Sequence, residues 1–184
     1  MNTRRRWFAI GDPQTTFEKF LAILREHHLL DMHDRLRDDV GLVSIGDHFD
    51  FAPHGRALAD VGRDGTDILR WLADHPRDQV VILMGNHDAA RVMELAYETD
   101  ERFAQARELA EKGTPEEFVR AFPRIPTPDI ALRDYSSFAT HQREVVQKLL
   151  LDARMQLAAV GRLAGRDVLL THASVTDVQV EQLG

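Results

Sequence analysis

Leu-Val-Ser-Ile-Gly-Asp-His-Phe-Asp, residues 42–50, is an apolar run that ends in a glycine and two carboxylates. The apolar residues at its start are typical of a short buried strand, and Gly46 allows the backbone to turn sharply after it. Asp47 is then expected at the carboxyl edge of the sheet that the strand joins. Ligands of open α/β sheets bind at that edge.

The same arrangement recurs at three other places in the chain. Apolar runs at residues 7–10, 80–84 and 168–170 lead into Gly-Asp-Pro-Gln at 11–14, Gly-Asn-His-Asp at 85–88 and Thr-His at 171–172. A single Gly-Asp after a strand is usually a plain turn. Four junctions that carry Asp12, Asp47, Asn86 and His172 in one chain instead indicate one shared site.

Composition restricts the chemistry of such a site. The chain has 184 residues, enough for one domain with its own core, and it contains no cysteine. Disulfides and thiolate metal sites are therefore excluded, and any metal is held by oxygen and imidazole ligands. Manganese, magnesium, iron and zinc fit that description.

Charge and hydropathy exclude other classes of partner. The formal net charge is −7, and no basic stripe is interleaved with aromatic residues, so non-specific nucleic-acid binding is not expected. No apolar segment approaches the roughly 20 residues of a membrane span, and the arginines at 4–6 precede a short strand-like run rather than a signal-peptide core. The expected location is the cytoplasm, without membrane contact.

The first half of the chain alternates strands and helices. Strands are expected at residues 7–10, 42–45 and 80–84, with helices at 17–24 and at about 66–75 between them. Residues 51–65, rich in glycine and interrupted by Pro53, are expected to form a loop. This alternation predicts an α/β fold with right-handed crossovers and a parallel sheet.

Residues 89–160 are expected to form a helical insertion without strands. Thr114 and Pro115 indicate a helix start, and the apolar positions from Val146 to Leu157 and Val160 predict one long amphipathic helix. The last strand is expected at residues 167–170. We therefore predict a single domain, 1–184, whose insertion packs over or beside the site, because both of its ends adjoin the motifs.

The polar residues at the strand ends suit phosphate chemistry. Their oxygens and imidazole would bind divalent cations such as Mn²⁺, and Asp47, on the central strand, could bridge two ions. Two ions generate a bridging hydroxide at neutral pH and clamp a phosphate. His87, next to the ligand Asn86, would then donate a proton to the leaving oxygen, with Asp50 as the carboxylate that orients it.

The four motifs, Gly11-Asp12-x-Gln14, Gly46-Asp47-x-x-Asp50, Gly85-Asn86-His87-Asp88 and Thr171-His172, together resemble the calcineurin-like metallophosphoesterases. The resemblance implies a sandwich of two mixed sheets flanked by helices. It also implies two metal ions, most often Mn, with Fe, Zn, Mg or Ni as alternatives. By position, Asp12 and Gln14 would bind the first ion, Asp47 would bridge, Asn86 and His172 would bind the second, and His87 would be the catalytic histidine.

The sequence departs from the family pattern in two respects. Gln14 stands where the first motif normally has histidine, and the closing Gly-His-x-His-like motif is absent from the sequence. The chain is then expected to be either an incomplete, amino-terminal part of a longer protein or a naturally short member. If the chain is fully active as it stands, His48 and His54 are the nearest candidates to complete the ligand set.

Two functions from different classes follow from this pattern. The first is a metal-dependent phosphoesterase that hydrolyses a phosphate ester or anhydride of a phosphorylated small molecule, a nucleotide or a phosphoprotein. The alternative is a non-catalytic scaffold or regulatory domain that binds a phosphate-containing ligand or partner. The sequence does not identify the substrate, because the specificity of such a site comes from loops and from the insertion.

Overall fold

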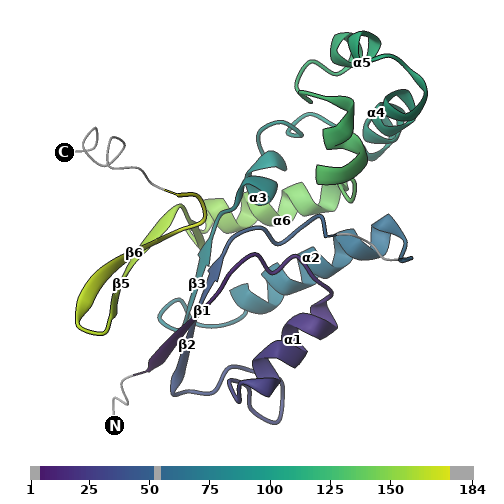
Figure 1. Ribbon diagram of the computed structural model, residues 1–184. Helices are drawn as coiled ribbons and strands as arrows, with labels where there is room; N and C mark the ends of the chain where they lie inside the picture. Colours follow the sequence, from purple (N-terminus) through teal and green to yellow (C-terminus); the bar gives the residue numbers. More distant parts are fainter. Residues whose placement is uncertain (1–4, 52–54, 175–184) are drawn as a thin grey trace, which may run out of the picture.

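A four-stranded parallel sheet forms the centre of the computed structural model, which describes residues 5–51 and 55–174 (Figure 1). Its strands lie in the order β1 (Arg6–Ile10), β2 (Val40–Ile45), β3 (Val80–Leu83) and β4 (Met155–Gln156), and each pairs in parallel with the next. The first three are the strands expected from the sequence. The predicted α/β fold class is confirmed.

Three helices cover one face of this sheet: α1 (Phe17–Glu26), α2 (Leu58–Ala73) and α6 (Thr140–Leu151) (Figure 1). Because side chains alternate between the faces of a strand, Leu42 and Ile82 point to the same side, and both are buried in the core that the helices share with the sheet. Trp7 lies on the other face and is 49% exposed. Its ring packs so closely on Gly41 that a Cβ there would lie 2.6 Å from the indole.

Helix α2 begins at Leu58, about eight residues before the expected start, so the prediction of a loop over residues 51–65 was wrong for this part. The glycines that suggested a loop are needed for close packing instead. A Cβ at Gly62 would lie 2.5 Å from the Gln142 amide, and a Cβ at Gly65 would overlap the ring of Phe49. Contact with neighbouring elements therefore outweighs the low helix propensity of glycine.

The first part of the insertion is helical, as predicted. It contains α3 (Asn86–Ala90), α4 (Asp100–Lys112), α5 (Pro115–Ala121) and a π-helical turn, η1 (Ile130–Asp134). Thr114 caps α5, since its hydroxyl accepts from Glu117 N at 3.3 Å and the Glu117 carboxylate accepts from Thr114 N at 3.0 Å. Aromatic side chains, among them Phe103, Phe118 and Phe138, form a second core inside this segment.

The second part of the insertion contradicts the prediction of one long helix through Val160. Helix α6 ends at Leu151, Ala153 adopts a left-handed conformation (φ 48°), and Met155 is buried in β4 beside β3. Leu157 and Val160 are 72% and 79% exposed, so they do not continue the buried stripe of α6. Pairing with the open edge of β3 outweighs helical periodicity here.

The expected strand at residues 167–170 exists, but it lies outside the parallel sheet. It is β6 (Arg166–Thr171), which pairs antiparallel with β5 (Ala158–Leu163) in a two-stranded hairpin. The described residues thus contain one parallel sheet and one antiparallel pair, in place of the two mixed sheets implied by the resemblance. No helix in the described ranges is long and apolar enough to cross a bilayer.

Candidate functional site

The ends of β2 and β3 approach each other so closely that only glycine fits at their turns. Gly46 and Asp47 both have left-handed backbones, with φ of 77° and 55°. A Cβ on Gly46 would lie 2.9 Å from Nδ1 of His172, and a Cβ on Gly85 would overlap the Asp47 carboxylate. Asp47, whose side chain lies at the centre of the predicted site, is thus a non-glycine residue in a strained conformation, as are Asp12 and Asp50.

Asp88 fastens the two turns together. Its fully buried carboxylate accepts hydrogen bonds from the backbone N–H groups of Gly85 at 2.9 Å, Asp47 at 3.0 Å and His48 at 3.2 Å. Burial opposes the charge of Asp88, but His48 and these hydrogen bonds lower its pKa below the ordinary value. The sequence alone gave this fourth residue of the Gly-Asn-His-Asp motif no role.

His48 does not belong to the ligand set. It is fully buried, its Nδ1 lies 3.0 Å from the Asp88 carboxylate, and its Nε2 lies 2.9 Å from the Ser44 hydroxyl. Both ring nitrogens therefore already have partners, and the expectation that His48 could complete the site is wrong. His54, the other candidate, lies outside the described residues.

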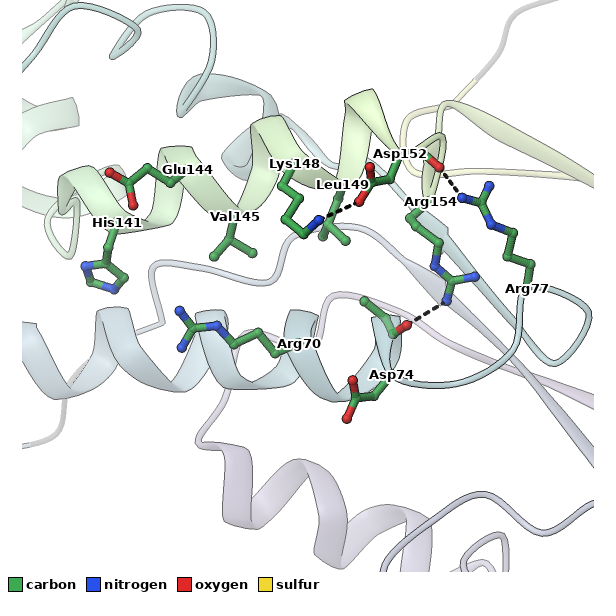
Figure 2. A pocket seen from close by; sticks show the side chains of 11 residues that line it. Arg70, Asp74, Arg77, His141, Glu144, Val145, Lys148, Leu149, Asp152 and Arg154 are labelled. Atoms are coloured by element: carbon green, nitrogen blue, oxygen red, sulfur yellow. Dashed lines mark hydrogen bonds and ion pairs between the residues drawn. The ribbon is translucent and has the colours of Figure 1, made fainter.

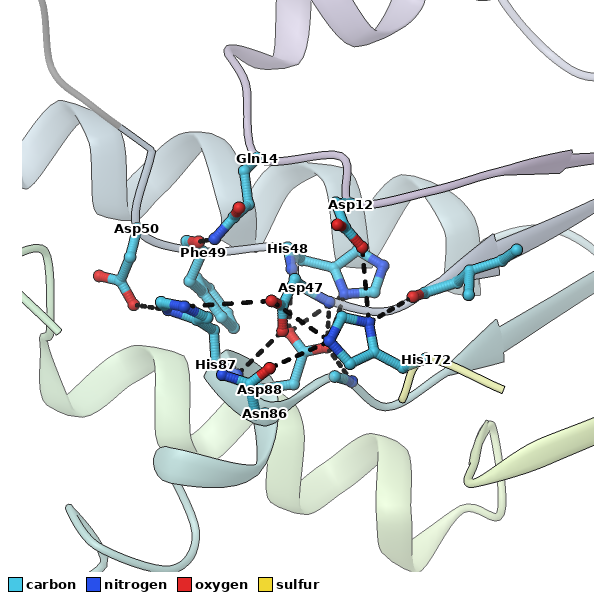
Figure 3. A network of polar contacts seen from close by, with 12 residues as sticks. Asp12, Gln14, Asp47, His48, Phe49, Asp50, Asn86, His87, Asp88 and His172 are labelled. Carbon is cyan, nitrogen blue, oxygen red and sulfur yellow. Dashed lines mark hydrogen bonds and ion pairs between the residues drawn. The ribbon is translucent and has the colours of Figure 1, made fainter. Parts of the chain in front are cut away.

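His172 brings the β5–β6 hairpin to the ends of the parallel strands (Figure 3). Its Nδ1 lies 2.8 Å from the carbonyl oxygen of Ile45 and 3.5 Å from a carboxylate oxygen of Asp12. Its Nε2 lies 3.0 Å from Oδ1 of Asn86 and 3.4 Å from Oδ2 of Asp47. The structure thus brings together four of the five predicted metal ligands, Asp12, Asp47, Asn86 and His172.

The donor chemistry of these four residues fits a divalent cation. Every neighbour of the His172 ring nitrogens is an oxygen acceptor, whereas a neutral imidazole has only one N–H to donate. If Nδ1–H donates to Ile45, the lone pair of Nε2 faces the oxygens of Asn86 and Asp47. Ligand atoms bound at about 2.0–2.2 Å to one ion lie roughly 3.0–3.4 Å apart at ordinary coordination angles. The separations from Nε2 match that spacing.

The amide oxygen of Asn86 is one of the two neighbours of Nε2 of His172. Among the residues described, no three His, Asp or Glu side chains by themselves have the arrangement of a metal site. Gln14 has a different partner: its Nε2 donates to the carbonyl oxygen of Phe49 at 2.9 Å. Its assignment as a ligand remains a prediction.

His87 and Asp50 form a hydrogen-bonded pair beside the four ligands (Figure 3). Nδ1 of His87 lies 3.0 Å from Oδ2 of Asp50, and the backbone N–H of His87 donates to Oδ1 of Asp47 at 2.9 Å. Burial opposes a charge on the ring, but the hydrogen bond to Asp50 and the charges of Asp50 and Asp47 raise the pKa of His87. This arrangement favours the protonated imidazole, the form that a proton donor requires.

Asp50 has further partners that the sequence did not reveal. Its fully buried carboxylate accepts from the N–H of Ser137 at 3.1 Å and from its hydroxyl at 2.6 Å, and it pairs with Arg91 at 2.6 Å. Burial alone would raise the pKa of Asp50, but Arg91, His87 and Ser137 lower it below the ordinary value. No local pattern marks Arg91 or Ser137, because they reach Asp50 only through the tertiary fold.

A comparison with protein families agrees with this geometry. The model of the family described as calcineurin-like phosphoesterase matches residues 6–177. The chain belongs to the calcineurin-like phosphoesterase family. Neither the curated proteins nor the solved structures gave a match to the chain. The resemblance inferred from the four motifs is thus confirmed at the level of the family.

A hollow of about 460 Å³ opens beside the His87–Asp50 pair of this family member. Its lining comes from the first motif, the turn after β2, α2 and η1: Gln14, Asp50, Phe51, Leu58, His87, Leu132, Arg133, Asp134 and Ser136. The side chain of Gln14 therefore borders space next to His87 rather than the Asp12–His172 group. The insertion contributes the wall that faces His87.

A larger cavity of about 530 Å³ lies elsewhere, between α2 and α6 (Figure 2). Two of its basic groups have partners within the fold: Lys148 pairs with Asp152 at 2.9 Å, and the Arg154 guanidinium donates to the carbonyl oxygen of His75 at 2.9 Å. None of its lining residues belongs to the four family motifs. The smaller hollow is therefore the candidate site of this family member.

Proposed function

We propose that the chain is a metal-dependent phosphoesterase that hydrolyses a phosphate ester or anhydride. Family membership supports phosphohydrolase activity in general. The observation that carries the specific proposal is the placement of the His87–Asp50 pair beside Asp47, whose carboxylate converges with the Asn86 oxygen on Nε2 of His172. A phosphate held at those groups would have the His87 imidazole next to its leaving oxygen.

The proposed ligands are Asp12, Asp47, Asn86 and His172, with Gln14 as a fifth candidate, and Asp47 is the proposed bridge. Two divalent cations, Mn²⁺ first and Fe, Zn, Mg or Ni as alternatives, would supply charge neutralisation of the phosphate and an activated water. The neutral ligands Asn86 and His172 add no negative charge, so Asp12 and Asp47 provide most of the electrostatic attraction for the cations.

The residues of the chain perform the remaining steps. Nδ1–H of His87 donates to Asp50, which fixes the tautomer and the plane of the ring. Nε2 lies 4.0 Å from Oδ2 of Asp47, so the protonated edge of the ring faces the ligand group. From there, Nε2–H is positioned to give its proton to the leaving oxygen of a substrate. The T-shaped contact with Tyr135, at 6.0 Å between ring centroids, holds the ring from the side of the insertion.

The hollow beside His87 is the proposed place for the leaving group. Phe51, Leu58 and Leu132 give it apolar walls, and Arg133 and Asp134 give it charged ones. We propose that the insertion acts as a cap on this side, because Leu132 and Arg133 come from η1. A phosphorylated small molecule, a nucleotide or a phosphoprotein remains the proposed substrate range. The cytoplasmic location and the lack of non-specific nucleic-acid binding remain predictions from the sequence.

For a direct test, the metal is first removed from the protein with a chelator. Hydrolysis of an aryl phosphate is then measured while Mn²⁺ is titrated in. Activity that appears with bound Mn²⁺ and disappears in His87→Ala supports the proposal. The alternative, a non-catalytic scaffold, predicts binding of Mn²⁺ and of inorganic phosphate without turnover of any ester. Absence of both metal binding and turnover would refute the two functions together.

A further inference from the structure

Arg91 is the largest fully buried side chain of the described structure, and it lies one helical turn after His87. Its NH1 is 2.6 Å from the Asp50 carboxylate and donates to the carbonyl oxygen of His87 at 3.0 Å. One guanidinium nitrogen therefore contacts both members of the proposed proton-donating pair. The carboxylate partner and the backbone of the histidine are fixed to the same point.

The other side of the guanidinium is tied to the insertion. Its Nε donates to Oε1 of Gln142 at 3.0 Å, and Nε2 of Gln142 donates to the carbonyl oxygen of Ser137 at 2.7 Å. Ser137 in turn donates to Asp50 at 2.6 Å, so the contacts form a closed ring, Asp50–Arg91–Gln142–Ser137. The guanidinium also lies 4.6 Å from the centre of the Phe49 ring, which prevents it from tilting away.

A purely stabilising role does not account for this arrangement. Desolvation makes a buried ion pair a weak source of stability, and apolar side chains of similar volume often serve as well or better. What the pair adds is geometry. Oδ2 of Asp50 is shared by Arg91 and His87, while Oδ1 is occupied by Ser137, so the carboxylate has one orientation in which to receive Nδ1 of His87.

We propose that Arg91 is a positioning residue of the phosphoesterase reaction. Held by Gln142, it orients the Asp50 carboxylate and through it the His87 ring toward the leaving oxygen. This inference rests on the proposed function. It connects the insertion to the proton-donating pair, because Gln142 and Ser137, which contact Arg91 and Asp50, both belong to the insertion.

The kinetic test compares Arg91→Met with the parent chain on two substrates, an alkyl phosphate and p-nitrophenyl phosphate. A positioning role through the proton donor predicts that kcat falls about 10²-fold on the alkyl ester, which needs protonation, and less than about 10-fold on the nitrophenyl ester. KM and the number of Mn²⁺ ions bound should change little. Arg91→Lys, which retains the positive charge, should recover part of the loss.

Arg102→Met is the matched control. Arg102 also lies in the insertion, pairs with Glu98 at 2.9 Å and lies 5.0 Å from the centre of the Phe122 ring, yet it has no contact with His87 or Asp50. It should leave the ratio of the two kcat values unchanged. Equal losses on both substrates in Arg91→Met would overturn the proposal and indicate a merely structural role.

A second measurement is independent of turnover. In the metal-free parent chain, proton NMR should show a slowly exchanging His87 Nδ1–H, because that proton is bound to a buried carboxylate. Arg91→Met should lose the signal and Arg102→Met should keep it. If the parent hydrolyses no phosphoester but shows this pattern, the proposed function fails; Arg91 then orients the His87 ring, but it is not a positioning residue of that reaction. A signal unchanged in Arg91→Met refutes the positioning role itself.

Gln142→Met provides a second variant in case Arg91→Met does not fold. It removes the acceptor of Arg91 Nε and keeps the Arg91–Asp50 pair, so the selective loss on the alkyl ester should be smaller, about 3- to 10-fold, with faster exchange of the His87 proton. A folded Gln142→Met chain that matches the parent in both measurements would overturn the link to the insertion.

Discussion

Nδ1 of His172 lies 2.8 Å from the carbonyl oxygen of Ile45, so the ring is fixed to the strand that leads to Asp47. This contact leaves Nε2 as the nitrogen available to a cation. His172→Asn keeps a donor for Ile45 and removes Nε2, so we expect Mn²⁺ affinity to fall at least about 10- to 100-fold. Calorimetric titration measures this change. His28→Asn, at an exposed left-handed position that asparagine tolerates, is the control and should bind Mn²⁺ as the parent does.

Asp47→Asn should remove activity and most of the metal binding together. Asp47 is the proposed bridge, and its carboxylate lies 3.4 Å from Nε2 of His172 while it also accepts from the backbone N–H of His87. The asparagine keeps the volume but loses the charge that serves both ions. Metal analysis of the purified variant is the measurement, and two Mn²⁺ ions per chain in that variant would rule out the bridging assignment.

His87→Ala should keep the bound metals and lower kcat by about 10² to 10⁴, the usual scale for a positioned proton donor. The ring is 15% exposed and contacts the ligand group only through its 4.0 Å approach to Asp47, so its loss does not remove a ligand. Steady-state rates on esters with good and poor leaving groups provide the test. A loss that is the same for both would count against proton donation.

Gly85→Ala should displace the Asp47 carboxylate, since the new Cβ would overlap that side chain and its backbone nitrogen. We expect the free energy of unfolding to fall by about 1–3 kcal/mol and Mn²⁺ binding to weaken more than stability alone explains. Gly161→Ala in β5 is the matched control, because its Cβ would meet only Val168 at an ordinary 3.6 Å. Denaturant unfolding and Mn²⁺ titration of both variants test this prediction. Metal binding equal to that of the parent in Gly85→Ala would contradict it and would show that the two turns can separate.

Acid should lower the free energy of unfolding of the metal-free chain, partly through protonation of Asp50. Its pKa is lowered in the folded state, because Arg91, His87 and Ser137 together outweigh the effect of burial. The charged carboxylate therefore contributes stability at pH values above its ordinary pKa of about 3.9, and this contribution disappears as pH falls through the lower folded value. The stability difference between the parent and Asp50→Asn should be largest between the ordinary pKa values of aspartate and histidine. It should shrink in acid as Asp50 is protonated, and it should also shrink as pH rises through the raised pKa of His87, whose charged form Asp50 stabilises. Asp67→Asn, in an exposed ion pair on α2, is the control and should show little difference at any pH; a difference for Asp50→Asn that does not vary with pH would contradict the assignment.

The sequence predicted the parts of the molecule in which local pattern and tertiary structure agree. Strands β1 to β3 and the turns that carry Asp12, Asp47 and Asn86 follow from apolar runs that end at polar residues. The long helix through Val160 failed because apolar spacing alone does not distinguish α6 from the strands that follow it. The available sequence signal for the β5–β6 hairpin was the dipeptide Ala164-Gly165. In the structure these two residues form its turn, with φ of 50° and 82°.

The contacts around Asp50 could not be read from the sequence. Arg91 follows Asp50 by 41 residues and Ser137 follows it by 87 residues, and neither lies in a recognisable motif. Buried arginine is uncommon, so its position would be expected at the surface until its carboxylate partner is known. Only the three-dimensional arrangement shows that Arg91 and Asp50 form an ion pair.

The late position of His172 and Ser137 in the chain affects when the site can form during synthesis. A nascent polypeptide that has released the chain only as far as α3 already contains Asp12, Asp47, Asn86 and His87, but it lacks the ring that contacts Ile45 and the serine that donates to Asp50. Because chains emerge amino terminus first, hydrolytic competence should arise only after the insertion has folded and the hairpin has docked. Under the proposed function, unfinished chains on the ribosome would then be unable to hydrolyse phosphoesters.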